Sequence, residues 1–255
     1  MSQPTLAEIT PIIKKAGALA LKGCRSLNQL QVTEKAPRDL VTEIDLQVEQ
    51  FLIKALSKLD KSIGFFGEET GQSSSQERRW IIDPIDGTHS FVRGQYFWAI
   101  SLGLEIEGTL RLGAVYAPKL KDLYLGELGK GATKNGLPIQ ASKVARLDQA
   151  MVSTGFACLR AGLENHNLPR FSRIAQATMG QRRFGSAALD ICLCADGQVD
   201  AFWEQELNLY DIAGGVVIAK EAGCRVTNFA GEEVLNPKEV LVTNGLLTKP
   251  LVTLM

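Results

Sequence analysis

The sequence lacks the features that mark membrane or exported proteins. No run of about 18 apolar residues occurs in the 255 residues, so we expect no membrane span. The first ten residues, MSQPTLAEIT, lack the basic and apolar regions of a signal peptide. Lysine plus arginine and aspartate plus glutamate both number 28, so no net charge attracts nucleic acid or an anionic membrane. We therefore expect a cytoplasmic protein without a nucleic-acid or membrane partner.

Cysteine is also scarce, and its pattern excludes a disulfide scaffold. The five cysteines are an odd number scattered along the chain, which is typical of a reducing compartment. Cys192 and Cys194 are close in sequence, but this spacing puts their thiols on different faces of a helix and no second pair exists. We expect buried free thiols.

No internal repeat and no long linker interrupts the chain. At 255 residues with 45% hydrophobic residues, it can form one large domain or two tightly packed halves. A chain of this size buries roughly 70–75% of its extended-chain surface. We expect two halves, residues 1–145 and 146–255, in one compact unit, and the only clearly polar loop at residues 71–79.

Two helices are predicted before residue 60. Thr5 and Glu8 have the spacing of a capping box. The apolar stripe after them consists of Leu6, Ile9, Ile12, Ile13, Ala16 and Ala20. A second helix follows DLVTEID (39–45), so Asp45 falls in or near its first turn, where a carboxylate is favoured. Its predicted apolar face consists of Val48, Phe51, Leu52, Ala55 and Leu56.

The remainder of the chain predicts a mixed α/β protein. Short buried strands are expected at 62–66 and 80–82, and the turn-punctuated pieces between 96 and 140 are typical of an antiparallel meander. The second half alternates between strands and helices. Its predicted elements are a strand at 150–156, a helix at 186–197, a strand at 199–204 and a helix at 211–223.

Acidic residues follow three separate predicted strands. They are Glu68 with Glu69, Asp83 with Asp86, and Asp211. Each alone is compatible with an ordinary turn or a solvated corner. Together they are harder to explain, because Asp83 lies at the mouth of a hydrophobic strand and the next cationic residue along the chain is Arg93. Clustered acids without basic partners indicate a divalent cation, and oxygen ligands without His or Cys favour Mg²⁺.

The residues after these acids indicate what the metal would hold. Gly87 and Thr88 lie where a helix could begin, and the free amides of a helix start favour a phosphate. Metal ions and such amides together are suited to phosphoryl transfer to water. Thr88, paired with a carboxylate such as Asp45, could orient that water and relay its proton.

At these residues the sequence resembles the inositol monophosphatase superfamily of Mg²⁺-dependent phosphatases. The resemblance covers nearly the whole chain and rests on segments that occur in the family's order. They are DLVTEID (39–45), GEE (67–69), WIIDPIDGT (80–88), GSAALD (185–190) and WEQELNLYDIAGG (203–215). It implies a layered αβαβα sandwich of the sugar-phosphatase type, a homodimer and inhibition by Li⁺.

The resemblance also implies a role for each site residue. The ligands of two to three Mg²⁺ ions would be Glu68, Asp83, Asp86, Asp211 and the carbonyl of Ile85. Gly87 and Thr88 would receive the phosphate, and Thr88 with Asp45 would activate the water, supported by Glu69. The residues implied to contact the rest of the substrate are Asp86, Gly185, Ser186, Ala187 and Glu204.

Three positions depart from the family's pattern. His89 and Ser90 follow Thr88, and we interpret His89 as a tolerated loop variant or an added polar contact at the pocket's edge. Tyr210 replaces a tryptophan before the last metal aspartate, and Glu206 replaces a glycine near the substrate end. These last two changes leave the substrate open.

Several substrates therefore remain as alternatives. The leading prediction is a phosphomonoesterase acting on inositol monophosphate or a related polyol phosphate. Histidinol phosphate is favoured by Glu206 and by YDI at 210–212. Fructose 1,6-bisphosphate is a third alternative, and a 3′(2′),5′-bisphosphate nucleotide is a fourth, although no insertion offers a base-binding surface. A non-catalytic regulatory protein on the same scaffold is the alternative from a different class.

Overall fold

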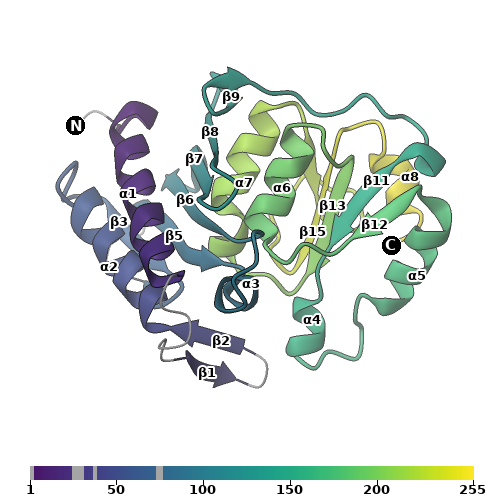
Figure 1. Ribbon diagram of the computed structural model, residues 1–255. Coiled ribbons are helices and arrows are strands. Elements are labelled where there is room, and N and C mark those ends of the chain that lie inside the picture. Colours follow the sequence, from purple (N-terminus) through teal and green to yellow (C-terminus); the bar gives the residue numbers. More distant parts are fainter. Residues whose placement is uncertain (1–2, 25–31, 37–38, 73–76) are drawn as a thin grey trace.

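The computed structural model describes residues 3–24, 32–36, 39–72 and 77–255. These residues form alternating layers of helix and sheet, as Figure 1 shows, so the predicted αβαβα sandwich is confirmed. The helical layers are α1 (Leu6–Cys24) with α2 (Glu43–Leu56), α6 (Ala187–Ala195) with α7 (Leu209–Glu221), and α5 (Leu168–Ala177) with α8 (Thr248–Val252). Among the described residues, no helix is both long and apolar enough to cross a membrane.

The larger sheet lies between the first two helical layers. Its described strands, in spatial order, are β10 (Leu137–Pro138), β9 (Gly131–Lys134), β8 (Asp122–Glu127), β7 (Thr109–Ala117), β6 (Ala99–Ile106), β5 (Arg78–Asp86), β3 (Gly64–Gly67) and β4 (Gly71–Gln72). The antiparallel meander predicted at 96–140 is confirmed from β6 to β10, and β5 also pairs antiparallel with β6. The predicted loop at 71–79 is wrong at both ends, because β4 pairs with β3 and β5 begins at Arg78. Residues 73–76 lie outside the described residues.

The smaller sheet belongs to the second half of the chain. Its described strands, in spatial order, are β12 (Gly180–Arg182), β11 (Met151–Thr154), β13 (Ala201–Gln205), β15 (Glu239–Thr243) and β14 (Arg225–Thr227). A hairpin of β1 (Val32–Ala36) and β2 (Asp39–Thr42) was not expected from the sequence. The short helical turns are α3 (Thr88–Val92), η2 (Leu147–Gln149) and α4 (Ala157–Arg160).

Side-chain caps fix where the first two helices begin. The predicted capping box of α1 is confirmed, because the Thr5 amide donates to Glu8 Oε2 at 2.8 Å. In α2, Thr42 is the N-cap, and its amide donates to Asp45 Oδ2 at 2.8 Å. Asp45 is therefore in the first turn, as expected, and its position is fixed by the helix start itself.

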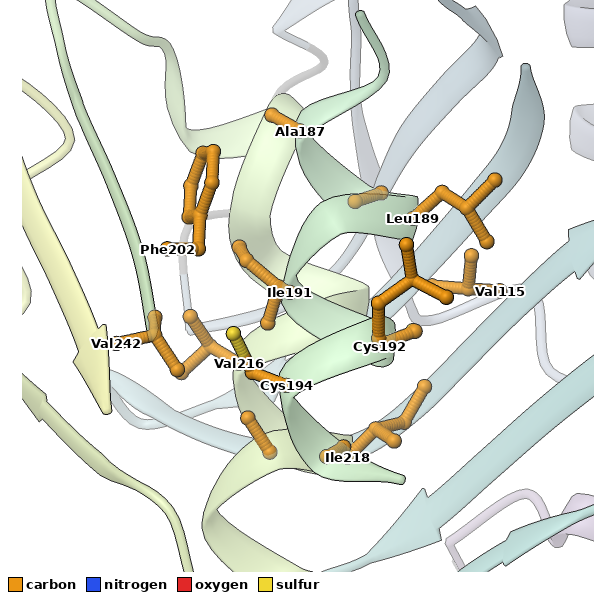
Figure 2. Close-up of a cluster of buried hydrophobic side chains, with 14 of the residues drawn as sticks. Val115, Ala187, Leu189, Ile191, Cys192, Cys194, Phe202, Val216, Ile218 and Val242 are labelled. Atoms are coloured by element: carbon orange, nitrogen blue, oxygen red, sulfur yellow. The ribbon is translucent and has the colours of Figure 1, made fainter. Parts of the chain in front are cut away.

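Helix α6 forms the centre of the core and is buried on every side. All nine of its residues are buried, which fits a helix that is apolar all round. Figure 2 shows its side chains packed against Val216 of α7, Phe202 of β13 and Val115 of β7. Cys192 and Cys194 lie in this core as free thiols. The prediction of buried free cysteines is confirmed for four of the five, since Cys24 is only half-buried.

Glycines allow α7 to pack closely on the larger sheet. A Cβ at Gly103 of β6 would lie 2.8 Å from the Cβ of Ala213, and one at Gly214 would lie 2.8 Å from the carbonyl oxygen of Leu102. Both distances are too short for real side chains, so only glycine permits this approach. Helix α7 also begins at Leu209, two residues earlier than predicted, which puts Asp211 in its first turn beside the sheet.

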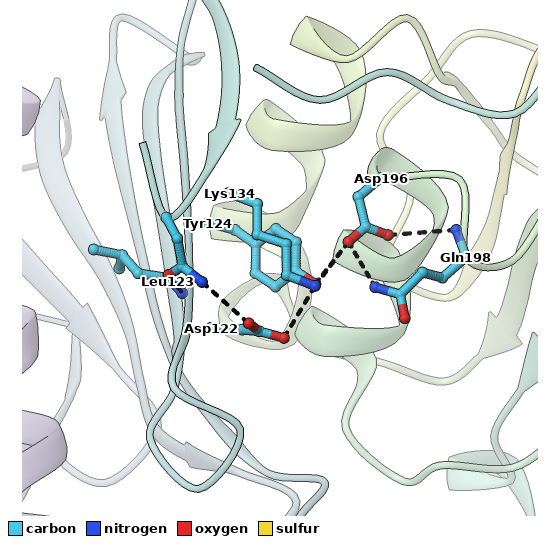
Figure 3. Close-up of polar contacts among 7 residues, drawn as sticks. Asp122, Leu123, Tyr124, Lys134, Asp196 and Gln198 are labelled. Carbon is cyan, nitrogen blue, oxygen red and sulfur yellow. Dashed lines mark hydrogen bonds and ion pairs between the residues drawn. The ribbon is translucent and has the colours of Figure 1, made fainter. Parts of the chain in front are cut away.

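A charged cluster connects the β8–β9 hairpin to the end of α6. Lys134 Nζ lies 3.0 Å from Asp122 Oδ2 and 3.0 Å from Asp196 Oδ2, as Figure 3 shows. Asp196 Oδ2 also accepts hydrogen bonds from Tyr124 and Gln198, at 3.0 and 2.7 Å. This cluster joins residues from both sides of position 145. The division into halves at that position stays a prediction.

Candidate active site

Strand β5 carries two aspartates into the interior. Its pairing with β6 is irregular between Asp83 and Asp86, and Gly87 turns the chain away with a φ of 94°. This φ lies in the left-handed region that favours glycine. Both aspartates are buried and belong to the strand itself, whereas the sequence predicted them beyond its end.

Three carboxylates, two from β5 and one from α7, meet beside this turn. Ligand oxygens of Asp83, Asp86 and Asp211 all lie within 4.8 Å of one another. They line a cavity of about 80 Å³. The lining residues are Glu68, Asp83, Ile85, Asp86, Gly87, Thr88, His89, Arg160, Arg183, Gly185 and Asp211. Every predicted metal-ligating residue is therefore at this cavity.

Burial and mutual repulsion make these acids hard to ionise. Burial, followed by the charges of Glu68, Asp86 and Asp211, raises the pKa of Asp83 well above its usual value. Burial and the charge of Asp86 raise the pKa of Asp211 in the same way. The pKa of Asp86 is raised to about 6, again mainly by burial. Four oxygen-donating acids around one cavity fit a hard divalent cation, which would offset their charge.

The start of α6 holds Asp86 in place. Asp86 Oδ2 accepts hydrogen bonds from Ser186 Oγ at 2.7 Å and from the amide of Ala188 at 2.6 Å. These donors favour the charged form and limit the rise of the Asp86 pKa. Ser186 and Ala187 are both buried and are not among the residues that line the cavity. Their predicted contact with the substrate stays a prediction, whereas Gly185 does line the cavity.

Thr88 links the cavity to Asp45. Its hydroxyl lies 3.1 Å from the carbonyl oxygen of Ile85 and 3.4 Å from Asp45 Oδ1. The other carboxylate oxygen of Asp45 accepts from the amide and the hydroxyl of Thr42, at 2.8 and 2.5 Å. Burial, more than the charge of Glu69, raises the pKa of Asp45 to about 6. The predicted pair of Thr88 and Asp45 is therefore brought together.

Glu49 is a supporting residue that sequence reasoning missed. It lies one helical turn after Asp45 on α2, is fully buried, and accepts from the amides of Glu69 and Thr70 at 3.0 and 2.8 Å. A Cβ at Gly67 would overlap its carboxylate. Glu49 therefore holds the turn that presents Glu68 to the cavity. The sequence did contain a signal for Glu49: it lies four residues after Asp45, which places both side chains on the same face of the helix.

Glu204 lies behind the cavity rather than on its wall. Its Oε1 accepts from the amide of Ala157 at 2.9 Å, and a Cβ at Gly155 would overlap the carboxylate. Burial raises the pKa of Glu204 to about 7, against the opposing effects of the Ala157 amide and of Arg160 and Arg183. The predicted contact of Glu204 with the alcohol stays a prediction.

The sequence predicted that the clustered acids have no basic neighbours, and the positions of two arginines show that this prediction is wrong. Arg160 and Arg183 line the cavity, although they lie 77 and 100 residues after Asp83 in the sequence. Both are exposed, as is His89, so these three residues form the mouth of the cavity above the buried acids. No local motif marks either arginine, which is why sequence reasoning missed them.

The other two departures from the family's pattern lie outside the cavity wall. Tyr210 packs against Phe66, with ring centroids 5.8 Å apart. Glu206 has a φ of 66°, a left-handed conformation that suits the glycine it replaces. Its carboxylate lies 2.7 Å from Lys238 Nζ, so the charge that was expected near the substrate is paired.

Comparison with known proteins identifies the family of this chain. The model of the inositol monophosphatase family matches residues 1–254. The chain belongs to the inositol monophosphatase family. An inositol-1-monophosphatase of Mesorhizobium japonicum is 33% identical over 93% of this chain and 90% of its own length. The Nus factor SuhB of Pseudomonas aeruginosa is 33% identical over 98% of this chain and 95% of its own length.

Solved structures of family members have the same fold. The SuhB protein of Bartonella henselae superposes with a TM-score of 0.92 at 31% identity, covering 98% of this chain and 97% of its own. An inositol-monophosphate-bound structure of SaIMPase-II has a TM-score of 0.82 at 26% identity, covering 98% of this chain and 93% of its own. The family thus includes proteins named for phosphatase activity and proteins named as Nus factors.

Proposed function

We propose that this protein is a Mg²⁺-dependent phosphomonoesterase that hydrolyses inositol monophosphate or a related polyol phosphate to the alcohol and inorganic phosphate. The observation that carries the proposal is the approach of Asp83, Asp86 and Asp211 to within 4.8 Å of one another. Asp83 and Asp86 are buried and Asp211 is half-buried, and carboxylates this close repel one another unless a cation lies between them.

The cavity's own oxygen atoms would hold the metal. The residues that would hold two to three ions are Glu68, Asp83, Asp86, Asp211 and the carbonyl of Ile85. Bound divalent ions would neutralise the phosphate oxygens, lower the pKa of a water and stabilise the leaving oxygen. The all-oxygen ligand set favours Mg²⁺, and inhibition by Li⁺ is proposed from the resemblance alone.

The protein would orient the water through Thr88. The hydroxyl carries one proton, and donating it to Asp45 leaves the lone pairs of Thr88 free to accept from a water in the cavity. As that water attacks phosphorus, its proton passes to Thr88 Oγ1 and the threonine's own proton passes to Asp45 Oδ1. The phosphorus–oxygen bond to the alcohol breaks, the alcohol oxygen takes a proton from the surrounding water, and Asp45 returns the proton that it received to the solvent. Glu69 would support Asp45, and Gly87 and Thr88 would receive the phosphate.

The assignment of partners is also a proposal. We infer a cytoplasmic homodimer that acts on a small phosphate monoester, with no nucleic-acid or membrane partner. The last inference rests on the balanced charge of the chain. Because some relatives are named Nus factor SuhB, a non-catalytic role is the competing proposal for this chain. The two proposals differ in whether phosphate is released.

A substrate panel tests the proposed function. Phosphate release would be measured from inositol 1-phosphate, histidinol phosphate, fructose 1,6-bisphosphate and adenosine 3′,5′-bisphosphate, with Mg²⁺ and with EDTA. We expect release that requires Mg²⁺, with one compound well above the others. If no compound released phosphate and Mg²⁺ left the melting temperature unchanged, the phosphatase proposal would be wrong and the non-catalytic role would take its place.

A further inference from the structure

The buried floor and the exposed mouth of the cavity determine where the alcohol part of a substrate must lie. This step rests on the proposed function, in which the reacting phosphate occupies the space beside the buried acids. The cavity has a volume of about 80 Å³, and the carboxylates of Asp83, Asp86 and Asp211 lie together at its floor. A phosphate held beside these acids occupies the floor of the cavity. The alcohol must therefore extend outward through the mouth, past His89, Arg160 and Arg183.

The two arginines reach the mouth from separate parts of the small-sheet region. Arg160 is the last residue of α4, and Arg183 directly follows β12. The guanidinium of Arg183 lies so close to Gly185 that a Cβ at that glycine would overlap it. Two positive charges thus lie at the mouth of a cavity whose floor is made of carboxylates.

In the described part of the chain, these guanidinium groups form no side-chain contacts that hold the fold together. Among the residues that can be placed, neither Arg160 nor Arg183 has a hydrogen bond or an ion pair, whereas Arg79 contacts Glu105 at 2.5 Å. The charges of both arginines lower the pKa of Glu204. The Glu204 carboxylate is nevertheless buried and already accepts a hydrogen bond from the amide of Ala157. The planar donor fork of an arginine matches the oxygens of a phosphate or a carboxylate.

We propose that Arg160 and Arg183 form a second anion subsite that binds a phosphate or carboxylate group on the alcohol part of the substrate. The preferred substrates are then phosphomonoesters that carry a second anionic group. A cationic alcohol, such as that of histidinol phosphate, is repelled at the same position. The subsite narrows the set of candidate substrates that the sequence left open. It also assigns substrate specificity to two residues that lie outside the quoted motifs.

Two matched pairs of substrates isolate the effect of the second anion. Fructose 1,6-bisphosphate is compared with fructose 1-phosphate, and 6-phosphogluconate with sorbitol 6-phosphate, all at the same free Mg²⁺ concentration. The first pair adds a phosphate and the second adds a carboxylate, so they also distinguish the two anions. We expect kcat/KM to be roughly tenfold higher for the doubly anionic member of at least one pair.

Arginine variants then test the assignment. Arg160→Gln and Arg183→Gln should each lower that preference roughly tenfold, while changing kcat/KM for the singly anionic ester by no more than about threefold. Arg183→Lys should restore part of it, since it keeps the charge but not the donor fork. Arg182→Gln is the matched control, because Arg182 is exposed, donates to the neighbouring carbonyl of Gln181 and does not line the cavity.

The outcomes separate this inference from the proposed function. The subsite would be overturned if all four esters were turned over without a preference for the second anion. It would also be overturned if both glutamine variants kept that preference. Either result would leave the phosphatase proposal standing. The arginines would then serve only to balance the charge of the acids. No turnover of any of the four esters, with phosphate still released from inositol 1-phosphate, would overturn the subsite alone. No release from inositol 1-phosphate either would overturn the phosphatase proposal, and the subsite with it.

Discussion

Two clusters of largely buried carboxylates in this protein have opposite charge arrangements. In the paired cluster of Figure 3, Lys134 lies 3.0 Å from both Asp122 and Asp196. In the acid cluster of Asp83, Asp86 and Asp211, the described residues form no ion pair with any of the three. The chain supplies the neutralising cation in the first cluster. In the second cluster, the charge of Arg160 acts on Asp86 without an ion pair, and we propose that a bound cation neutralises the remaining charge.

This difference separates a structural role from a functional one. A carboxylate paired within the fold stabilises it, and removing the partner leaves an uncompensated charge. A cluster of like charges destabilises the fold until a ligand neutralises it, so its retention indicates selection for that ligand. The same chemical change should therefore have opposite effects on stability in the two clusters.

Replacing one acid in each cluster has the largest expected effect. Asp83→Asn should abolish turnover, because it removes a carboxylate from the group that would hold the metal. In EDTA it should raise the melting temperature, since it removes a repelled buried charge. Asp196→Asn should lower the melting temperature and retain activity, because it weakens the contact with Lys134. Phosphate release and thermal unfolding measure both variants. Near-normal activity of Asp83→Asn would contradict the site.

The acid cluster should also make the effect of Mg²⁺ depend on pH. The pKa of Asp86 is about 6 in the fold and 3.8 when unperturbed. Protonation therefore favours folding, and this contribution, complete below about pH 4, is lost as the pH rises through about 6. For Asp86 alone it is on the order of 3 kcal/mol. Burial shifts the pKa of Asp83 and Asp211 in the same direction.

Unfolding in EDTA and in Mg²⁺ measures this effect. Because the metal binds only ionised carboxylates, the gain in unfolding free energy caused by Mg²⁺ should grow from about pH 5 to about pH 7.5. Asp45 and Glu204 also titrate in this range, and comparing the two conditions at each pH largely removes their contribution. A gain from Mg²⁺ that is constant over this range would show that these acids do not bind it.

In the paired cluster, removing the cation should cost stability and leave function intact. Lys134→Met should lower the unfolding free energy by about 2 kcal/mol, less than for a fully buried pair because Tyr124 and Gln198 still donate to Asp196. Lys130→Met is the matched control. Its exposed contact with Glu127, at 2.6 Å, should contribute less than about 1 kcal/mol. Urea unfolding measures both, and equal losses would show that burial does not matter here.

The two clusters also differ in how far they could be predicted from the sequence. Asp83, Asp86 and Asp211 were predicted because acids after apolar strands are unusual and occur in ordered motifs. The pairing of Lys134 with Asp196 was not predicted, since the residues lie 62 positions apart and neither belongs to a motif.

The same reason explains what was missed elsewhere. Periodicity located the main helices and the meander, because both patterns are local. Glu49, Arg160 and Arg183 reach the site only through the packing of separate layers, which no local pattern encodes. The start of α7 was placed two residues late, because the cap formed by Asn208 with Asp211 was not recognised.

Ser186 allows the smallest test, because two roles compete for it. The sequence assigns it to the substrate, whereas its hydroxyl donates to Asp86 at 2.7 Å and accepts from the amide of Leu189 at 3.3 Å. Ser186→Ala should therefore lower stability by about 1 kcal/mol and weaken Mg²⁺ binding several-fold. Ser186→Thr, which keeps the hydroxyl, is the control. A raised KM with unchanged Mg²⁺ affinity would assign the hydroxyl to the substrate instead, and α6 would then not position the acid cluster through this residue.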